Sequence, residues 1–482
     1  MAVRRSLAWM AFGQSIFFCL QFAGSIVIAR LLTPYEIGVF AIAMAVVGLV
    51  SVIQAIGLNN FIVREQALTR DVVASASAAN ALISVLLALA IAGLGYLGGA
   101  LFKEPGVRDV LLVLAIVPVI GHLAFVPGAM LEREGSFRTI ALLRAASTAI
   151  GVLLTVALAW RGYSYMSLAY SQVATAVLTN VTTNIVARRH VTFRFSFAHW
   201  ARVWRFGLQI FAISGINRMA NRMMEVSLGG ILGLGQLGLF SRASSNHNML
   251  WDNIHGVVGR VIFVDFSQRA QEGAPLGDRY LRVLELMTGL LWPMFAMVAI
   301  LAAPLIVLIY GMPWLGAAAP LSMLCIASII LVSTTMSWEV FVICHETARQ
   351  VRFEFVRTIL GILMFVGGCF ISLEAAAASR ILDALFAQFL YRPHLERMTG
   401  AARGAFGIVY LRSGCAAAAA IVPALALMIA WRFSPQVPLA QIALAIVAGG
   451  VLWLLALRGL RHELYREITT ALGRVRQRMV PA

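Results

Sequence analysis

Two arginines and a glutamate stand close together in an otherwise apolar stretch, SGINRMANRMMEVSLGG, which covers residues 214–230. At 3.6 residues per turn, Arg218, Arg222 and Glu225 line one face of a helix, with Asn217 and Asn221 beside them. An arginine that faces lipid at the middle of a bilayer costs about 2.5 to 3.5 kcal/mol even on the mildest scale. This face must therefore turn toward protein or water, where a guanidinium can bind a carboxylate or a phosphate through two hydrogen bonds.

The next apolar stretch, residues 236–263, is polar along one side as well. Arg242 and Asn246 lie one turn apart, and Asp252 follows further along the same stretch. A helix of this composition is too polar to face lipid on that side. The sequence therefore predicts that both stretches line a common hydrated cavity.

Two interpretations of these charges stay open. Arg222 and Glu225, three residues apart, can neutralise each other inside a packed bundle. That pairing leaves Arg218 and Arg242 unexplained, and arginines outnumber acids in the two stretches. The surplus of guanidinium groups favours an anionic ligand that carries phosphate.

The elements that hold these residues are predicted membrane spans. Of the 482 residues, 61% are hydrophobic and 12% are charged, with a mean hydropathy of +0.86, whereas soluble domains are about 25% charged. A helix needs roughly 20 apolar residues to cross a bilayer, and about fourteen such runs can be marked, the first without a signal-peptide cleavage site. The predicted spans are residues 7–29, 37–58, 77–100, 109–131, 141–160, 164–186, 207–232, 236–263, 283–310, 316–343, 355–373, 377–391, 408–431 and 438–457.

The net charge of +17 predicts orientation in the membrane. Most of the 38 basic residues fall in alternate connections and in the two tails, so the positive-inside rule places both termini in the cytoplasm. The charge requires no nucleic-acid partner. Under this orientation Arg349, Arg357, Arg392, Arg397 and Arg461 fall inside, whereas Arg380 and Arg432 fall outside.

Two segments separated by 200 positions resemble each other. ARLLTPYEIGVFAIA at residues 29–43 aligns with GGILGLGQLGLFSRA at residues 229–243, and each leaves one span and enters the next through a short turn. Such a repeat is a common plan among transporters. The matched pairs are Leu32 with Leu232, Gly38 with Gly238, Phe40 with Phe240 and Ala43 with Ala243.

The repeat predicts two lobes of six helices followed by additional elements. The linker combines arginines with aromatic residues, which is typical of a helix lying on an anionic membrane surface. The predicted parts are an N-terminal lobe (1–186), an amphipathic cytoplasmic linker (187–206), a C-terminal lobe (207–395), two peripheral spans (396–458) and a basic cytoplasmic tail (459–482).

Several other classes of membrane protein fit the sequence poorly. The predicted outside loops are about ten residues or shorter, which leaves no room for the catalytic loop of a membrane glycosyltransferase or ligase. No G-x-x-x-x-G-K-[ST] motif is present, and the five cysteines have no metal-ligand spacing. The sequence therefore predicts a protein that is not an enzyme and that uses no cofactor or metal. A membrane scaffold without transport activity would leave the charged face around Arg222 unexplained.

The order and spacing of four stretches are typical of one known family. The stretches are ARLLTPYEIGVFAIAMAVVGLV, EVSLGGILGLGQLGLFSRA, VIFVDFSQRAQEG and PLIVLIYGMPWLGAAAPLSMLCIAS. On these stretches, and along essentially its whole length, the chain resembles the Wzx-type polysaccharide flippases of the multidrug, oligosaccharidyl-lipid and polysaccharide exporter superfamily. The resemblance implies an ion-coupled, alternating-access carrier in a bacterial inner membrane. Such carriers move undecaprenyl-pyrophosphate-linked oligosaccharide repeat units from the cytoplasmic to the periplasmic leaflet, and polymerisation and export proteins are their implied partners.

The resemblance also suggests a role for each candidate residue. Arg218, Arg222 and Arg242 would hold the pyrophosphate, and Glu225 and Asp252 would couple transport to an ion. A lipid II-type flippase shares the pyrophosphate carrier and stays an alternative, as does a multidrug exporter, although a basic cavity suits cationic drugs poorly. The candidates for contacts with sugar hydroxyls are Gln14, Asn217, Asn221 and Asn246.

Overall fold

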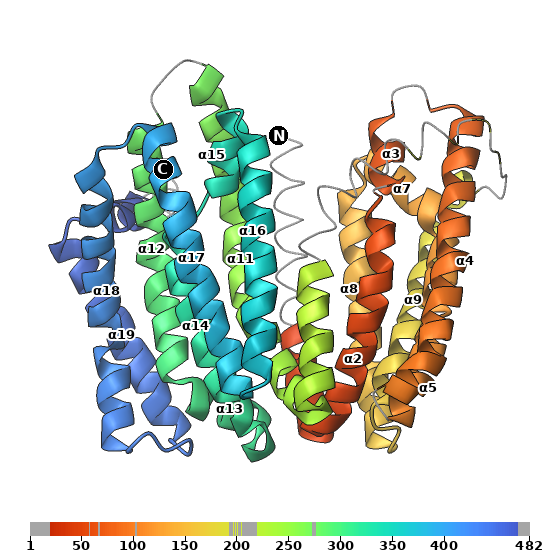
Figure 1. Ribbon diagram of the computed structural model, residues 1–482, viewed down its shortest axis with the longest axis horizontal. Helices are drawn as coiled ribbons and strands as arrows, with labels where there is room; N and C mark the ends of the chain where they lie inside the picture. The colour runs from red at the N-terminus through yellow and green to blue at the C-terminus, as the bar shows by residue number, and fades with distance from the viewer. Residues whose placement is uncertain are drawn as a thin grey trace, which may run out of the picture. The chain divides into compact units, whose positions relative to one another are not determined.

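The computed structural model describes residues 20–56, 58–65, 68–101, 104–191, 219–271 and 276–470, with the isolated positions 196, 198, 200 and 204. Every regular element in these ranges is a helix (Figure 1), and seven of the described helices are long and apolar enough to cross a membrane. The predicted all-α membrane fold is confirmed. At some positions the structure describes the backbone but not the side chain. These positions are residues 53, 55, 56, 60, 98–101, 252–265, 267–271 and 403.

The first compact unit comprises residues 1–238. Its described helices include long ones within predicted spans and several short ones. They are Leu20–Leu31, α2 (Pro34–Val50), η1 (Ser51–Ile56), α3 (Leu58–Arg64), α4 (Arg70–Leu101), α5 (Pro105–Leu114), α6 (Val117–His122), α7 (Phe125–Arg133), α8 (Phe137–Trp160), α9 (Met166–Val186), η2 (Arg188–His190) and a helix over 219–232.

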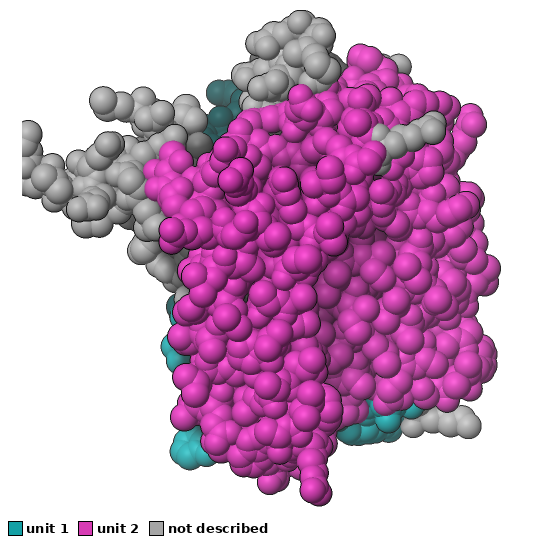
Figure 2. All heavy atoms as spheres, turned by 90° about the vertical axis from the view of Figure 1, so that its left-hand side faces the viewer, with its two compact units in different colours: residues 1–238 teal, residues 239–482 magenta. Residues whose placement is uncertain are grey.

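The second compact unit comprises residues 239–482, and the first turn of α11 still belongs to the first unit. Figure 2 shows the surface of this unit from the side of its last helices. The helices are α11 (Leu234–Gln271), α12 (Gly277–Ile300), α13 (Ala302–Tyr310), η3 (Met312–Ala317), α14 (Ala318–Val332), α15 (Ser337–Ile343), α16 (Thr347–Cys369), α17 (Leu373–Thr399), α18 (Arg403–Ala430) and α19 (Leu439–Gly459).

Local sequence determines where α2 begins. The Thr33 hydroxyl accepts a hydrogen bond from the Glu36 backbone N–H, and the Glu36 carboxylate accepts one from the Thr33 N–H at 2.7 Å. This capping box is followed by Pro34, whose fixed φ suits the first helical position. The Glu36 carboxylate also accepts a hydrogen bond from the Ser164 hydroxyl, which joins the start of α2 to the start of α9.

The predicted span over 109–131 is divided, because the structure breaks it into α5, α6 and α7. Backbone carbonyls at a break inside a membrane need other donors. Two asparagines of α9 supply them: the Asn180 amide donates to the Ile120 carbonyl at 2.5 Å, and the Asn184 amide donates to the Leu123 carbonyl at 3.2 Å.

The corresponding span of the second unit, predicted over 316–343, breaks in the same way between α14 and α15. The Tyr410 hydroxyl donates to the Ser333 carbonyl at 2.8 Å, and the Tyr280 hydroxyl donates to the Thr335 carbonyl at 3.0 Å. Met336, at the start of α15, has a left-handed backbone with φ of 60°. The two breaks show that the resemblance between the halves extends beyond the segments that align in sequence.

The aligned repeat segments meet at two glycines within the first unit. A Cβ atom at Gly38 would lie 1.8 Å from the Leu234 carbonyl oxygen, and one at Gly238 would lie 1.8 Å from the Pro34 carbonyl oxygen. Gly38 lies 200 positions before Gly238, and Pro34 lies 200 positions before Leu234. An approximate two-fold axis between the start of α2 and the start of α11 therefore relates the two contacts. Only glycine permits this close approach of two backbones.

The predicted linker is described at only a few positions. Trp200 and Trp204 pack against a buried apolar cluster of α3, α4 and α7 that includes Phe61, Ile62 and Ile83. These two aromatic side chains therefore pack on protein. The predicted boundaries of the lobes, linker and tail stay predictions, because most of residues 187–218 and 471–482 lie outside the described ranges.

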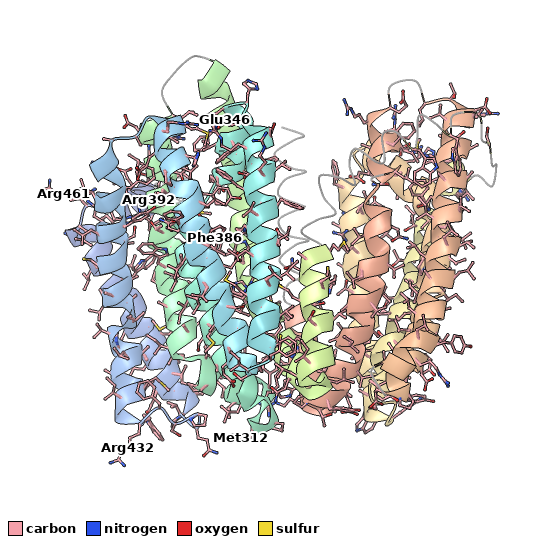
Figure 3. All side chains as sticks on the ribbon, viewed as in Figure 1. Met312, Glu346, Phe386, Arg392, Arg432 and Arg461 are labelled. Atoms are coloured by element: carbon pink, nitrogen blue, oxygen red, sulfur yellow. The ribbon has the colours of Figure 1, made fainter. Side chains whose placement is uncertain are left out.

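Figure 3 shows where several labelled side chains lie along the second unit. Glu346, Arg392 and Arg461 lie toward one end, whereas Met312 and Arg432 lie at the other. The Glu346 carboxylate pairs there with the guanidinium of Arg397 at 3.0 Å and with that of Arg349. The predicted assignment of these arginines to the two sides of the membrane stays a prediction.

Candidate functional site

The structure describes only part of the predicted site. Gln14, Asn217 and Arg218 lie outside the described residues, and for Asp252 the backbone alone is described, within α11. Arg222, Glu225, Asn221, Arg242 and Asn246 are described with their side chains. They fall in two groups, one in each compact unit.

In the first unit, Arg222 and Glu225 form the predicted ion pair. The Arg222 Nη1 donates to the Glu225 Oε2 at 2.7 Å, and the two side chains are 39% and 28% exposed. Both are only partly buried, so the pair does not sit in a packed core. The guanidinium can therefore still receive a second acceptor while it holds the carboxylate.

The other faces of this helix differ in burial. Met219 and Met223 are 49% and 39% exposed. The face that packs on protein is formed by Ala220, Met224 and Leu228, each at most 7% exposed. The exposed methionines are compatible with lipid contact, because their side chains are apolar and flexible.

In the second unit, Arg242 is enclosed by aromatic rings. The residue is 8% exposed, and its guanidinium carbon lies 5.0 Å from the Tyr310 ring centre and 5.1 Å from that of Trp314. Its Nε has no hydrogen-bond partner, and it forms no ion pair with any carboxylate whose side chain the structure describes. Cation–π contacts thus replace an acid as the local compensation for this charge.

Asn246 belongs to the same cluster, because its side-chain oxygen accepts a hydrogen bond from the Tyr310 hydroxyl at 2.6 Å. At the next residue, the His247 ring bonds the Ser328 hydroxyl at 2.5 Å and stacks on Phe295. The polar side of α11 is therefore covered by residues of α12, α13 and α14 at these positions. The contacts with Tyr310 and Trp314 could not be predicted, since those residues are distant in the sequence.

A second ionic cluster, between α16 and α17, was missed by sequence reasoning. The Asp383 carboxylate, 4% exposed, lies 3.4 Å from the Arg380 guanidinium and 4.0 Å from that of Arg357. Glu354 joins the cluster by accepting from Arg357 at 3.1 Å and from the Tyr391 hydroxyl at 2.8 Å. The available signal was the three-residue spacing between Glu354 and Arg357 and between Arg380 and Asp383.

This cluster corrects one detail of the predicted topology. Arg357 and Arg380 were assigned to opposite sides of the membrane, but both flank Asp383. The reason is that α16 already begins at Thr347 and α17 at Leu373, so that both arginines lie well inside helices.

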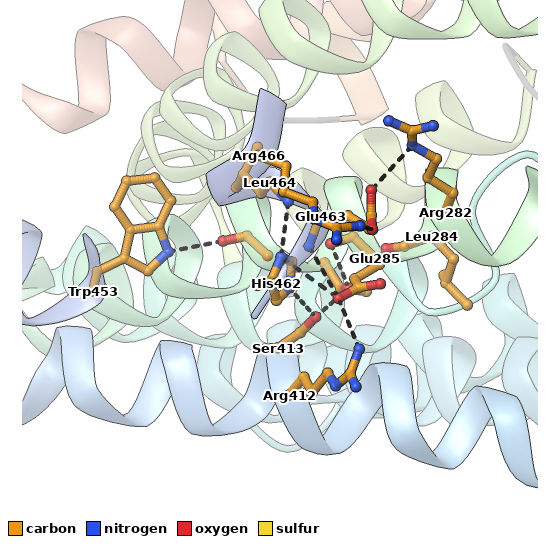
Figure 4. A network of polar contacts seen from close by, with 12 residues as sticks. Arg282, Leu284, Glu285, Arg412, Ser413, Trp453, His462, Glu463, Leu464 and Arg466 are labelled. Carbon is orange, nitrogen blue, oxygen red and sulfur yellow. Dashed lines mark hydrogen bonds and ion pairs between the residues drawn. The ribbon is translucent and has the colours of Figure 1, made fainter. Parts of the chain in front are cut away.

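A third polar network fixes the chain after α19 (Figure 4). His462, fully buried, bonds the Ser413 hydroxyl through Nε2 at 3.1 Å, and its Nδ1 accepts from the Leu464 N–H at 3.2 Å. Ser413 in turn bonds Thr288 at 2.8 Å. Because Nδ1 is an acceptor, the proton of the neutral ring lies on Nε2. The imidazole packs so closely on α12 that a Cβ at Gly289 would lie 2.4 Å from it.

Acid should weaken this network. Burial, reinforced by the positive charge of Arg412, lowers the pKa of His462 to about 4, below its usual value near 6.5. The unfolded chain then takes up the proton first, so the free energy of unfolding falls as the pH drops from about 6.5 to about 4. We expect a loss on the order of 1 to 2 kcal/mol across this window.

Denaturation of the detergent-solubilised protein at pH 7 and pH 4.5 measures this loss, with His462→Gln as the control. The variant should lose part of the pH dependence shown by the parent. An unchanged pH dependence in the variant would assign the effect to other groups.

Comparison with known proteins places this geometry in context. Residues 27–319 match the family model described as "Polysaccharide biosynthesis protein". The succinoglycan biosynthesis transport protein ExoT of Rhizobium meliloti (strain 1021) is 25% identical over 329 residues, which are 68% of this chain and 67% of that protein. The lipopolysaccharide biosynthesis protein WzxC of Escherichia coli (strain K12) is 19% identical over 324 residues, 67% of this chain and 66% of that protein.

Solved structures share the fold at low identity. The lipid II flippase MurJ, in an inward closed conformation, superposes with a TM-score of 0.71 at 13% identity, covering 94% of this chain and 99% of that one. An inward-facing multidrug resistance transporter of the MATE family and MOP superfamily gives 0.59 at 14% identity, covering 80% and 95%. The chain therefore has the fold of these transporters.

Proposed function

The chain belongs to the polysaccharide biosynthesis protein family, and from that premise we propose that it is a flippase for lipid-linked oligosaccharides. Its substrate is an oligosaccharide repeat unit carried on undecaprenyl pyrophosphate. The chain moves this unit from the cytoplasmic to the periplasmic leaflet of a bacterial inner membrane by alternating access, with both of its termini in the cytoplasm. Polymerisation and export proteins then receive the product.

Arg242 is the observation that supports this substrate most strongly. A cation that is 92% removed from solvent, with no carboxylate partner among the described side chains, is costly unless an anion approaches it during function. A pyrophosphate is such an anion. Tyr310 and Asn246, which are bonded to each other beside it, offer polar atoms to a sugar headgroup.

Arg222 supplies a second contact and a route to ion coupling. The phosphate and the Glu225 carboxylate compete for one guanidinium. When phosphate displaces Glu225, the released carboxylate is free to take up a proton or a metal cation, and when phosphate leaves, the ion pair re-forms. Substrate binding and ion binding are then linked through a single arginine, with Asp252 as the second candidate acid. Arg218, Asn217, Asn221 and Gln14 stay proposed as further contacts for the headgroup.

This role for Arg222 is tested in vesicles that contain the purified protein and a labelled oligosaccharide on undecaprenyl pyrophosphate. We expect Arg222→Ala to slow translocation at least about tenfold, because one charge-assisted contact is worth about 1.5 kcal/mol or more. Arg108→Ala is the control, since Arg108 is 50% exposed and pairs only with the adjacent Asp109 among the described residues. Equal rates for Arg222→Ala and the parent would remove Arg222 from the substrate path.

A further inference from the structure

Gly48, near the end of α2, lies directly against the side chain of Arg222. A Cβ atom at this glycine would be 2.6 Å from the Arg222 Nε, 2.8 Å from its Cδ and 3.1 Å from its Cγ. The three nearest atoms all belong to that one arginine. The stem of Arg222 therefore lies across the bare backbone of α2, in space that any other residue at position 48 would fill.

Two contacts thus hold the arginine. Glu225 binds the guanidinium from the same helix at 2.7 Å, and the backbone at Gly48 supports the stem from the neighbouring helix. An arginine side chain has many rotamers, and a phosphate site works best when its donors are already in place. The support from α2 removes part of this rotamer freedom before any ligand arrives.

The position along the helix also suits a transport site. Arg222 lies about ten residues before the end of the helix over 219–232, which corresponds to about 15 Å at 1.5 Å per residue. That distance is about half the thickness of the hydrocarbon core of a bilayer. A contact at this distance from the helix end suits a carrier that binds its substrate near the middle of the membrane.

We propose that Gly48 is a positioning residue for the substrate headgroup: it fixes the Arg222 guanidinium in the orientation that receives the phosphate of the lipid-linked substrate. This inference rests on the proposed function. A methyl group at position 48 displaces the arginine, because the α2 backbone is fixed by its helix whereas the arginine can change rotamer. The charge is retained, but the guanidinium moves away from both Glu225 and the phosphate.

A glycine that serves only helix packing has a different environment. At Gly229 a Cβ would meet the side chains of Ile42 and Leu237 at 2.9 and 3.0 Å, which are apolar packing contacts. At Gly48 no apolar side chain is among the three nearest atoms. If Gly48 acts through Arg222, truncating that arginine must abolish the effect of a methyl group.

The test is a double-mutant cycle of the parent, Gly48→Ala, Arg222→Ala and the double variant. Gly93→Ala is the matched control, because nothing lies within 4 Å of a Cβ there and it carries the same gain in helix propensity. Translocation of the undecaprenyl-pyrophosphate substrate and resistance to denaturation are both measured. We expect Gly48→Ala to slow translocation about tenfold and Gly93→Ala to leave it unchanged.

In the denaturation cycle, Gly48→Ala made in the Arg222→Ala protein should shift the unfolding midpoint by as much as Gly93→Ala does. Made in the parent protein, Gly48→Ala should raise the midpoint less than Gly93→Ala does, or lower it. Equal shifts in both backgrounds, or normal translocation by Gly48→Ala, would overturn the positioning role. If Arg222→Ala itself transports normally, the proposed contact of Arg222 with the substrate fails first, and the role of Gly48 falls with it. Loss of transport in Arg222→Ala but not in Gly48→Ala overturns this inference alone.

Discussion

Replacing Arg242 by methionine should slow translocation about 100-fold without lowering the stability of the protein. Loss of charge-assisted hydrogen bonds to a phosphate costs about 3 kcal/mol, and 1.4 kcal/mol is a factor of ten. Stability should be kept because the substitution removes a buried charge that has no carboxylate partner among the described side chains. Methionine is of similar length and packs well against the rings of Tyr310 and Trp314.

The two readouts for this variant are translocation in vesicles and the unfolding midpoint in detergent. Arg242→Lys is the matched variant that keeps the charge but lacks the planar fork of donors, so it should fall between the parent and Arg242→Met in rate. A methionine variant that is destabilised and still transports at the rate of the parent would assign Arg242 a structural role.

Replacing Asp383 by asparagine should have the largest effect on stability, a loss of about 3 kcal/mol or more. The carboxylate is 4% exposed and lies between the guanidinium groups of Arg380 and Arg357. Removing its charge takes away the carboxylate that lies between those two cations. Breaking a buried pair in this way costs more than the pair contributes, because the charge left behind stays out of water.

Chemical denaturation in detergent measures this loss. Asp109→Asn is the control, since that carboxylate is 45% exposed beside Arg108 and should change stability by no more than about 0.5 kcal/mol. The double variant Asp383→Asn with Arg380→Gln should recover part of the loss. If Asp383→Asn unfolds at the same denaturant concentration as the parent, the cluster contributes nothing to the fold.

Sequence alone was sufficient for the features that depend on local spacing. Apolar runs of about 20 residues predicted the spans. The three-residue spacing of Arg222 and Glu225 indicated an ion pair as one of two open interpretations, and the structure shows that pair. The alignment of Gly38 with Gly238 predicted a repeat, and in the structure these glycines form mirrored contacts.

Features that depend on which helices are neighbours could not be predicted. The break at Ser333–Met336 lies inside one predicted span, and the tyrosines that satisfy its carbonyls come from α12 and α18. The aromatic enclosure of Arg242 and the contact of Gly48 with Arg222 likewise join residues that are far apart in the sequence. Hydropathy and periodicity describe one helix at a time and carry no information about its partner.

The most direct test of the central claim is a comparison of two substrates in vesicles that contain the purified parent protein. One is an oligosaccharide on undecaprenyl pyrophosphate, and the other is the same oligosaccharide joined to undecaprenol through an uncharged linkage. We expect the protein to move the pyrophosphate form at least about tenfold faster than protein-free vesicles do, and to move the uncharged form no faster than they do. Equal movement of both forms, or no movement of either, would contradict the claim that Arg242 and Arg222 carry an anionic headgroup across the membrane.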